Sequence, residues 1–288
     1  MKNKKYFLWL KLVFSGQAIG GTIASVISVS MLAIGGSDTN GALFSFSFAA
    51  VFLVTVLILF QSATKQEFYQ HYANLVHQDS DHKDTTVKLT DIIKETWTFN
   101  LAVFLNFLVT LGVFPTFHSL AQTTSSSEEW QKYFVPVGCF LVFNVCDLLG
   151  RILAHWICWP RASWSGSIIT LVFSLARFAF IPLFVFCNVR FVWNYFSHLK
   201  HIWFSPDDRE LTQVYFKSDA VFMIINIVFG LSNGYINNIC LMAAPKMLKD
   251  PVLQSVSASH TAFSIVAGLL AGSAFSRFFV KLLWDSSK

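Results

Sequence analysis

Three polar residues with helical spacing, Asn144, Asp147 and Arg151, interrupt an otherwise apolar stretch of this sequence. Residues three and four positions apart share one face of an α-helix, so Asp147 can pair directly with Arg151. Aspartate accepts hydrogen bonds and arginine donates them from a planar fork, so together they can bind a neutral polar solute. The other interpretation is an internal ion pair that fixes helix packing, and the residues alone leave both open.

Other polar residues interrupt apolar stretches in the same way. The stretch 220–244 has a polar and small stripe on one side of a helix, which is either a close helix contact joined by amides or the wall of a cavity. Its members are Asn226, Gly230, Asn233, Gly234 and Asn237. Arg177 either joins the Asp147 network or reaches a helix end, and we interpret it as structural. Pro182 predicts a kink, and His118 and His155 are expected at the membrane interface.

No catalytic arrangement emerges from the sequence. The H-E-x-x-H, G-x-S-x-G and P-loop patterns are missing, and no nucleophile can be matched with a base. The polar run 77–86 includes four residues that could bind a metal, but nothing fixes their geometry, so we interpret the run as a solvated linker. They are His77, Asp79, Asp81 and His82. The five cysteines fall in apolar stretches and are interpreted as buried, inert thiols. We therefore expect no enzyme activity, metal or cofactor.

The composition shows which elements must hold these groups. Hydrophobic residues make up 54% of the 288-residue chain and charged residues 13%, against about 25% charged residues in a typical soluble domain. Too few charged groups remain to cover a globular surface in water. The composition excludes a soluble enzyme, a disordered chain and a nucleic-acid-binding module, and it indicates a protein embedded in the lipid bilayer. The net charge of +5 is then a signal of topology rather than of nucleic-acid binding.

Seven stretches are long and apolar enough to cross a bilayer, which needs about 20 residues per helix. The sequence thus predicts an all-α, polytopic membrane helix bundle with seven transmembrane helices. We expect the spans at 12–34, 41–60, 99–119, 134–158, 167–187, 220–244 and 260–284.

Topology follows from the positions of basic residues. The basic start followed by an apolar run is similar to a signal peptide, but the run continues to Ile34 and favours a retained span. The Lys and Arg distribution favours a cytoplasmic N-terminus and an outside C-terminus. We expect two spans in 1–60, a cytoplasmic loop at 61–98 with a short amphipathic helix at Glu67–Val76, and five spans in 99–288.

Two spans carry small residues every fourth position, which lets helices approach closely. They are Gly16, Gly20, Ala24 and Ser28 in the first span, and Ser264, Gly268, Gly272 and Ser276 in the seventh. We expect the seventh span to use this ladder to pack against the sixth.

Several motifs together resemble the C-terminal seven helices of the equilibrative nucleoside transporter family. They cover nearly the whole chain, and the most specific are Phe143–Arg151 (F-N-V-C-D-L-L-G-R) and Leu231–Tyr235 (L-S-N-G-Y). The others are Ser15–Ser25, Glu67–Tyr72, Arg177–Pro182, Cys187–Asn188, Ala244–Lys246 and Ser273–Ser276. Ala18 departs from the pattern, because glycine is common at that position.

The resemblance implies a function and a set of binding residues. It implies a partial transporter fold of the major-facilitator-like type that moves nucleosides, and in some members nucleobases, by alternating access between two helix bundles. Asp147 and Arg151 fall where the family binds the sugar and base, and Asn144, Phe140 and Leu269 fall at positions that line the cavity. The expected location is the plasma membrane, with an endomembrane as the alternative.

The family has eleven helices, and we expect the first four to be absent here. A truncated isoform, an incomplete gene model and a lineage that lost these helices are three explanations that the sequence leaves open. An alternative function follows: a non-transporting membrane protein that regulates or assembles with a full-length relative. A seven-helix receptor is a third option, but the basic N-terminus and the missing D-R-Y and N-P-x-x-Y motifs argue against it. The sequence does not indicate which nucleoside is moved, whether protons are coupled, or which oligomer forms.

Overall fold

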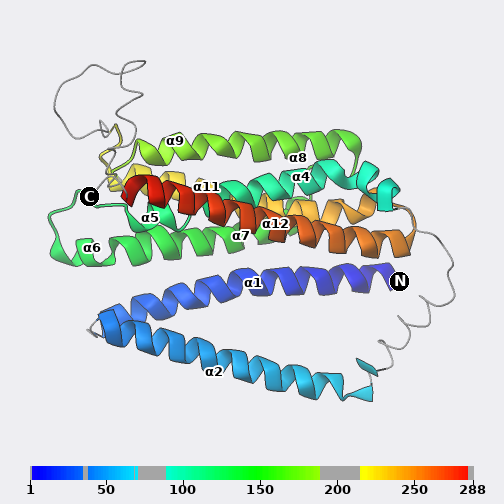
Figure 1. The fold of residues 1–288 in the computed structure, drawn as a ribbon, viewed down its shortest axis with the longest axis horizontal. Coiled ribbons are helices and arrows are strands. Elements are labelled where there is room, and N and C mark those ends of the chain that lie inside the picture. The colour runs from blue at the N-terminus through cyan, green and yellow to red at the C-terminus, as the bar shows by residue number, and fades with distance from the viewer. Residues whose placement is uncertain (1, 35–37, 68, 71–88, 189–214, 285–288) are drawn as a thin grey trace. The chain divides into compact units, whose positions relative to one another are not determined.

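The computed structural model describes residues 2–34, 38–67, 69–70, 89–188 and 215–284. It divides into two units, Met1–Ser25 with Thr90–Lys288, and Val26–Leu89. Within the described residues, seven helical segments are long and apolar enough to cross a membrane, which confirms the all-α bundle (Figure 1). The elements are α1 (Lys2–Ala33), α2 (Asp38–Thr64), α4 (Leu89–Val113), α5 (Thr116–Ser119), α6 (Glu128–Tyr133), η1 (Phe134–Leu141), α7 (Val142–Ile157), α8 (Trp164–Ala176), η2 (Arg177–Ala179), α9 (Phe180–Val185), α11 (Asp219–Ala243), η4 (Pro245–Met247) and α12 (Pro251–Trp284).

Several predicted boundaries differ from the helix boundaries by a helical turn or more: the first and fourth spans begin at Lys2 and Glu128 rather than at 12 and 134. The third span begins at Leu89 rather than at 99, and the seventh at Pro251 rather than at 260. In both cases polar or charged residues are mixed with apolar ones, so the missed stretch lacks the continuous hydrophobicity that defines a span, yet it continues the helix. The predicted loop 61–98 is therefore helical at both of its ends. Most of the predicted amphipathic helix Glu67–Val76 lies outside the described residues.

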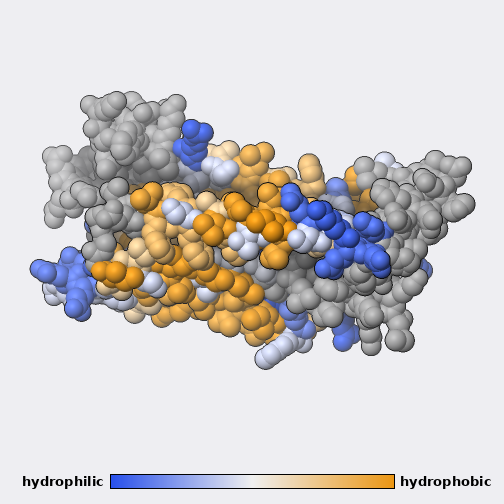
Figure 2. All heavy atoms as spheres, turned by 90° about the horizontal axis from the view of Figure 1, so that it is seen from below, coloured by the Kyte–Doolittle hydropathy of each residue, from blue (hydrophilic) through white to orange (hydrophobic). Residues whose placement is uncertain are grey.

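The surface suits a lipid environment. On α2 the side chains from Val51 to Phe60 are all exposed, and all but Thr55 are apolar. Hydrophobic residues form a broad band across the visible face in Figure 2, with hydrophilic residues on either side of it. Helices satisfy their own backbone hydrogen bonds, so such a surface can face hydrocarbon.

The fourth span contains a widened, π-helical segment, η1, just before α7. Its Pro136 has no N–H to donate, and the carbonyls of Gly138 and Cys139 each accept a hydrogen bond from Asn226 Nδ2 of α11, at 3.0 and 2.9 Å. A side chain of the sixth span thus takes the place of backbone donors. Helix α7, which carries the candidate site, follows this segment directly.

The fifth span is interrupted where the sequence predicts a kink. Helix α8 ends at Ala176, the turn η2 has 3-10 geometry, and α9 then contains Pro182. Proline cannot donate to the carbonyl four residues earlier and its ring crowds that carbonyl, which accounts for the changed geometry just before it. The interruption places Arg177 at the break in the helix.

Glycines bring α7 and α11 into backbone contact. A Cβ atom at Gly150 of α7 would lie 2.1 Å from Leu231 O, and one at Gly234 of α11 would lie 1.9 Å from Asp147 O. A Cβ at Gly230 would lie 2.8 Å from Phe143 O. These distances leave no room for a side chain, so glycine is required at this crossing. The fourth and sixth spans are therefore closely packed.

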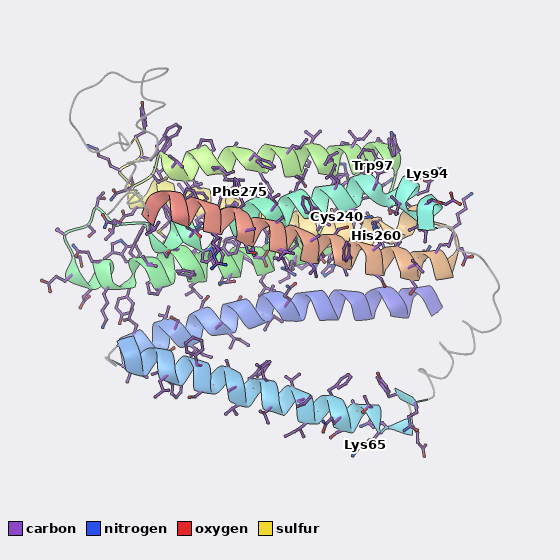
Figure 3. The ribbon with its side chains drawn as sticks, viewed as in Figure 1. Lys65, Lys94, Trp97, Cys240, His260 and Phe275 are labelled. Carbon is purple, nitrogen blue, oxygen red and sulfur yellow. The ribbon has the colours of Figure 1, made fainter. Side chains whose placement is uncertain are left out.

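The ladder of the seventh span packs on a different helix from the one predicted. A Cβ at Gly268 would lie 2.5 Å from Phe104 O, and one at Gly272 would lie 2.8 Å from Leu108 O. Both neighbours belong to α4, so the third span, not the sixth, faces this ladder. The seam runs along α12 between His260 and Phe275, both labelled in Figure 3.

A polar contact continues the same seam. Asn100 of α4 lies 2.8 Å from His260 Nδ1, and its Oδ1 accepts a hydrogen bond from Thr261 Oγ1 at 2.8 Å. Near the other end, Thr116 and Ser276 are also hydrogen-bonded. In contrast, a Cβ atom at Gly16 or Gly20 of the first ladder would meet nothing within 4 Å in the described part of the chain. That ladder is therefore not a packing seam there.

Candidate functional site

The site is built around the predicted ion pair on α7. Arg151 Nε donates to Asp147 Oδ2 at 3.0 Å, and the side chains are 3% and 9% exposed respectively. The pairing expected from the i, i+4 spacing is confirmed. Buried charges are costly in an apolar interior unless paired and hydrogen-bonded, so the remaining atoms of both groups should also find partners.

The second oxygen of Asp147 is held from the sixth span. Asn233 Nδ2 of α11 donates to Asp147 Oδ1 at 2.7 Å, and the glycine crossing brings the two helices close enough for this bond. Asn238, one turn further along α11, donates through Nδ2 to the carbonyl of Arg151 at 2.8 Å. The polar stripe of the sixth span therefore fixes α7 through amides as well as through glycines.

Residues of α1 lie against the same face of α7. Gln17 Oε1 accepts a hydrogen bond from Arg151 Nη1 at 3.3 Å. Asn144 Nδ2 donates to Ser25 Oγ at 2.8 Å and to the carbonyl of Phe140 at 3.0 Å. Gln17 and Ser25 lie within a motif that carried the resemblance, but sequence reasoning assigned them no role at the site.

A third helix joins the network through neutral groups. Asn233 Oδ1 accepts hydrogen bonds from Asn106 Nδ2 and Thr110 Oγ1 of α4, each at 2.8 Å. Thr110 Oγ1 in turn accepts a hydrogen bond from Arg177 Nη2 at 2.9 Å. Asn106 and Thr110 were missed because single polar residues in a long apolar helix carry little signal. Their i, i+4 spacing was the one cue.

Phe140 and Leu269 lie apart from each other. Phe140 packs edge-on against Phe114, with ring centroids 5.3 Å apart, in a cluster of aromatic rings. Leu269 is half-buried against a separate hydrophobic cluster that includes Phe107 and Ile236. Their assignment to a binding cavity remains a prediction.

His118 is fully buried inside the protein, and its expected place at the membrane interface remains a prediction. Its Nε2 lies 2.8 Å from Asn226 Oδ1, and because Asn226 Nδ2 already donates to two carbonyls, the histidine nitrogen must be the donor. Rings of five phenylalanines surround the imidazole: Phe114, Phe143, Phe184, Phe222 and Phe229. The histidine thus supports the amide that stabilises η1, a structural role.

The remaining polar predictions have mixed outcomes. Asn237 is buried, and both of its amide atoms lack a hydrogen-bond partner in the described part of the chain.

Cys158 is exposed, unlike the other four cysteines, because it follows the end of α7. The candidate metal ligands of 77–82 lie outside the described residues, and among those that are described no three His, Cys, Asp or Glu side chains gather in a way that could hold a metal.

The bundle and its buried polar network define an integral, multi-pass membrane protein with charged groups inside the membrane-spanning region. The family model described as "Nucleoside transporter" matches residues 73–281. The chain therefore belongs to the nucleoside transporter family, as the resemblance indicated.

Individual relatives agree with this assignment. The chain is 27% identical over 300 residues to equilibrative nucleoside transporter 1 of Homo sapiens, a match that covers 93% of this chain and 61% of the relative. It is 30% identical over 287 residues to equilibrative nucleoside transporter 3 of Rattus norvegicus, covering 91% and 56%. It is 33% identical over 193 residues to equilibrative nucleoside transporter 2 of Mus musculus, covering 67% and 38%. The chain thus spans less than two thirds of each of these relatives.

Proposed function

We propose that this chain takes part in facilitative transport of nucleosides across a membrane, and that Asp147 and Arg151 bind the substrate. The observation that carries the proposal is a hydrogen-bonded charge pair inside the membrane-spanning region of a nucleoside transporter family member. Each such charge costs about 2.5–3.5 kcal/mol on insertion scales. A binding role explains why the two charges are present despite this cost.

The chemistry of a nucleoside fits these groups. A ribose offers hydroxyl donors to the Asp147 carboxylate, which has about four lone-pair positions and uses two of them for Arg151 and Asn233. A base offers carbonyl or ring-nitrogen acceptors to the Arg151 guanidinium. Asn144 supplies an amide one turn earlier, while Phe140 and Leu269 supply apolar contact.

Movement completes the proposed mechanism. The pair is almost fully covered in this structure, so a substrate reaches it only when the helices around α7 move apart. We propose alternating access, with the last five spans carrying the site motif, the segment between α2 and α4 in the cytoplasm and the protein in the plasma membrane. Nucleobases are a second substrate class to be tested, and no chemical conversion of the substrate is involved.

Uptake by the chain expressed alone tests this proposal. Saturable uridine or adenosine uptake that a second nucleoside competes away would support it. Uptake no higher than in cells without the protein would contradict transport by this chain. Should the same chain then change the uptake of a co-expressed full-length relative, a regulatory partner would be the function instead.

A further inference from the structure

Arg177 is a buried cation whose hydrogen bonds all go to uncharged groups in the described part of the chain. It is 2% exposed. Its Nη1 donates to the carbonyl of Phe229 at 2.9 Å and to the Ser232 hydroxyl, and Nη2 donates to Thr110 Oγ1 at 2.9 Å. Its guanidinium also lies 4.6 Å from the centre of the Phe229 ring. The buried charged side chains of the described residues are Asp147, Arg151 and Arg177, so two cations share one carboxylate.

The hydrogen bonds between Arg177 and Asp147 all have the same direction. Arg177 donates to Thr110, Thr110 donates to Asn233 Oδ1 at 2.8 Å, and Asn233 Nδ2 donates to Asp147 Oδ1 at 2.7 Å. Guanidinium only donates and carboxylate only accepts, so the two ends set the direction of every bond between them. Hydrogen bonds aligned in this way polarise one another.

The geometry points to Arg177 as a positioning residue for Asp147. By occupying the acceptor side of Thr110, Arg177 turns the Thr110 hydrogen away from itself. That hydrogen has two acceptors in range, Asn233 Oδ1 and the carbonyl of Asn106 at 2.7 Å. When it reaches Asn233 Oδ1, it joins Asn106 Nδ2 in holding the amide so that the NH₂ group of Asn233 meets Asp147. Arg177 thus acts as a counter-ion of Asp147 through a relay formed by the side chains of Thr110 on α4 and Asn233 on α11.

This arrangement determines from which directions a substrate can donate hydrogen bonds to Asp147, a consequence that rests on the proposed function. With Oδ2 bonded to Arg151 and one position of Oδ1 taken by Asn233, the remaining acceptor positions have fixed directions. A substrate hydroxyl would meet a carboxylate that is already oriented. Loss of the relay would leave Oδ2 bonded to Arg151 but Oδ1 less firmly held, so binding should weaken even where folding survives.

A double-mutant cycle without substrate tests the relay itself. The variants are Arg177→Met, which replaces the guanidinium beside Phe229 with an unbranched apolar side chain, and Asp147→Asn. They are measured singly and together by the thermal midpoint of the purified protein. The two shifts should be non-additive by at least about 2 °C, and the coupling should shrink when Thr110 is replaced by Val. Arg177→Lys, which keeps a cation, should retain more coupling than Arg177→Met. Additive shifts, or coupling unchanged by Thr110→Val, would overturn the inference.

Thr110→Val tests the relay even if Arg177→Met gives no folded protein, because it keeps the charges of Arg177 and Asp147 and nearly the same side-chain shape. Its midpoint shift should then be smaller in the Asp147→Asn background than alone, and an equal shift in both would overturn the relay. Ser174→Ala is the matched control. Ser174 is buried on α8 one turn before Arg177 and bonds to the carbonyl of Thr170, so its effect should not depend on residue 147.

Nucleoside binding gives a readout that a purely structural role would not move. Thr110→Val should raise the uridine concentration for half-maximal binding by about fivefold or more, and by less than about twofold in the Asp147→Asn background. An equal loss in both backgrounds would overturn the positioning role. Should the unmodified chain bind no nucleoside, the proposed function fails, and the thermal cycle still decides the relay.

Discussion

Asn233 Nδ2 lies 2.7 Å from Asp147 Oδ1, so the carboxylate of the fourth span is held by the sixth span as well as by Arg151 of its own helix. The bond is made at the point where Gly234 and Gly150 bring the two backbones into contact. Packing and polar chemistry therefore depend on the same few residues. A change at this crossing can act on folding, on the site, or on both, and the predictions below separate these effects.

Exchanging the two side chains at this contact tests whether the position of the charge matters. Asn233→Asp alone should lower the thermal midpoint strongly, because two carboxylates then face each other. Adding Asp147→Asn restores an amide-to-carboxylate bond with reversed direction, and the new carboxylate still accepts from Asn106 and Thr110. The exchanged protein should recover most of its stability. Its nucleoside uptake should remain more than about tenfold lower, which corresponds to about 1.4 kcal/mol, and near-normal uptake would contradict a binding role for Asp147.

The α7–α11 crossing should not tolerate a single added methyl group. Gly234→Ala places a Cβ 1.9 Å from Asp147 O, and backbone atoms cannot move aside cheaply. We expect a large loss of folded protein, measured by detergent extraction and size-exclusion chromatography. Gly20→Ala is the matched control, since a Cβ there meets nothing within 4 Å and alanine is the better helix former by about 0.5–1 kcal/mol. Equal yields for the two variants would show that this crossing is looser than described.

The α4–α12 seam should respond differently at its two ends. A Cβ at Gly112 would lie 2.8 Å from Cδ1 of the Phe275 side chain, whereas one at Gly268 would lie 2.5 Å from the backbone oxygen of Phe104. Gly112→Ala should therefore be destabilising, and Phe275→Leu should restore part of the thermal midpoint. The same Phe275→Leu change should do nothing for Gly268→Ala. Rescue of both, or of neither, would contradict the described contacts.

Topology can be tested with cysteines in a background that lacks Cys158, the one exposed cysteine of the described chain. Gln66 and Ser126 are both exposed. With the N-terminus in the cytoplasm, an impermeant thiol reagent added to intact cells should label Ser126→Cys and leave Gln66→Cys unlabelled until the membrane is opened. The reversed pattern would invert the predicted orientation.

Long apolar stretches and intramembrane charges were sufficient to predict the number of spans and the central pair. Each span is a continuous apolar run, and Asp147 and Arg151 are one turn apart on a single helix, so local spacing fixes their contact. The first residues of α4 and α12 were missed because helical turns with polar residues resemble loops when only hydrophobicity is considered.

Contacts between helices were the least predictable part. The ladder of Gly268 and Gly272 identified a packing face, but nothing in its spacing names the partner, which is α4 rather than α11. The same holds for Asn233 and Thr110, whose roles appear only when three helices meet. The burial of His118 could not be predicted, because its position near the end of a span gives no sign of the phenylalanines that surround it.

The most direct measurement for the central claim is nucleoside uptake by the double variant Asp147→Leu with Arg151→Leu, normalised to protein at the cell surface. Removing one partner of a buried pair can cost about 3–5 kcal/mol of stability, whereas replacing both with apolar residues is often tolerated. If the pair binds substrate, the double variant should reach the surface and lose uptake by more than about tenfold. Uptake at the level of the unmodified chain would contradict the binding site and leave the pair with a packing role alone.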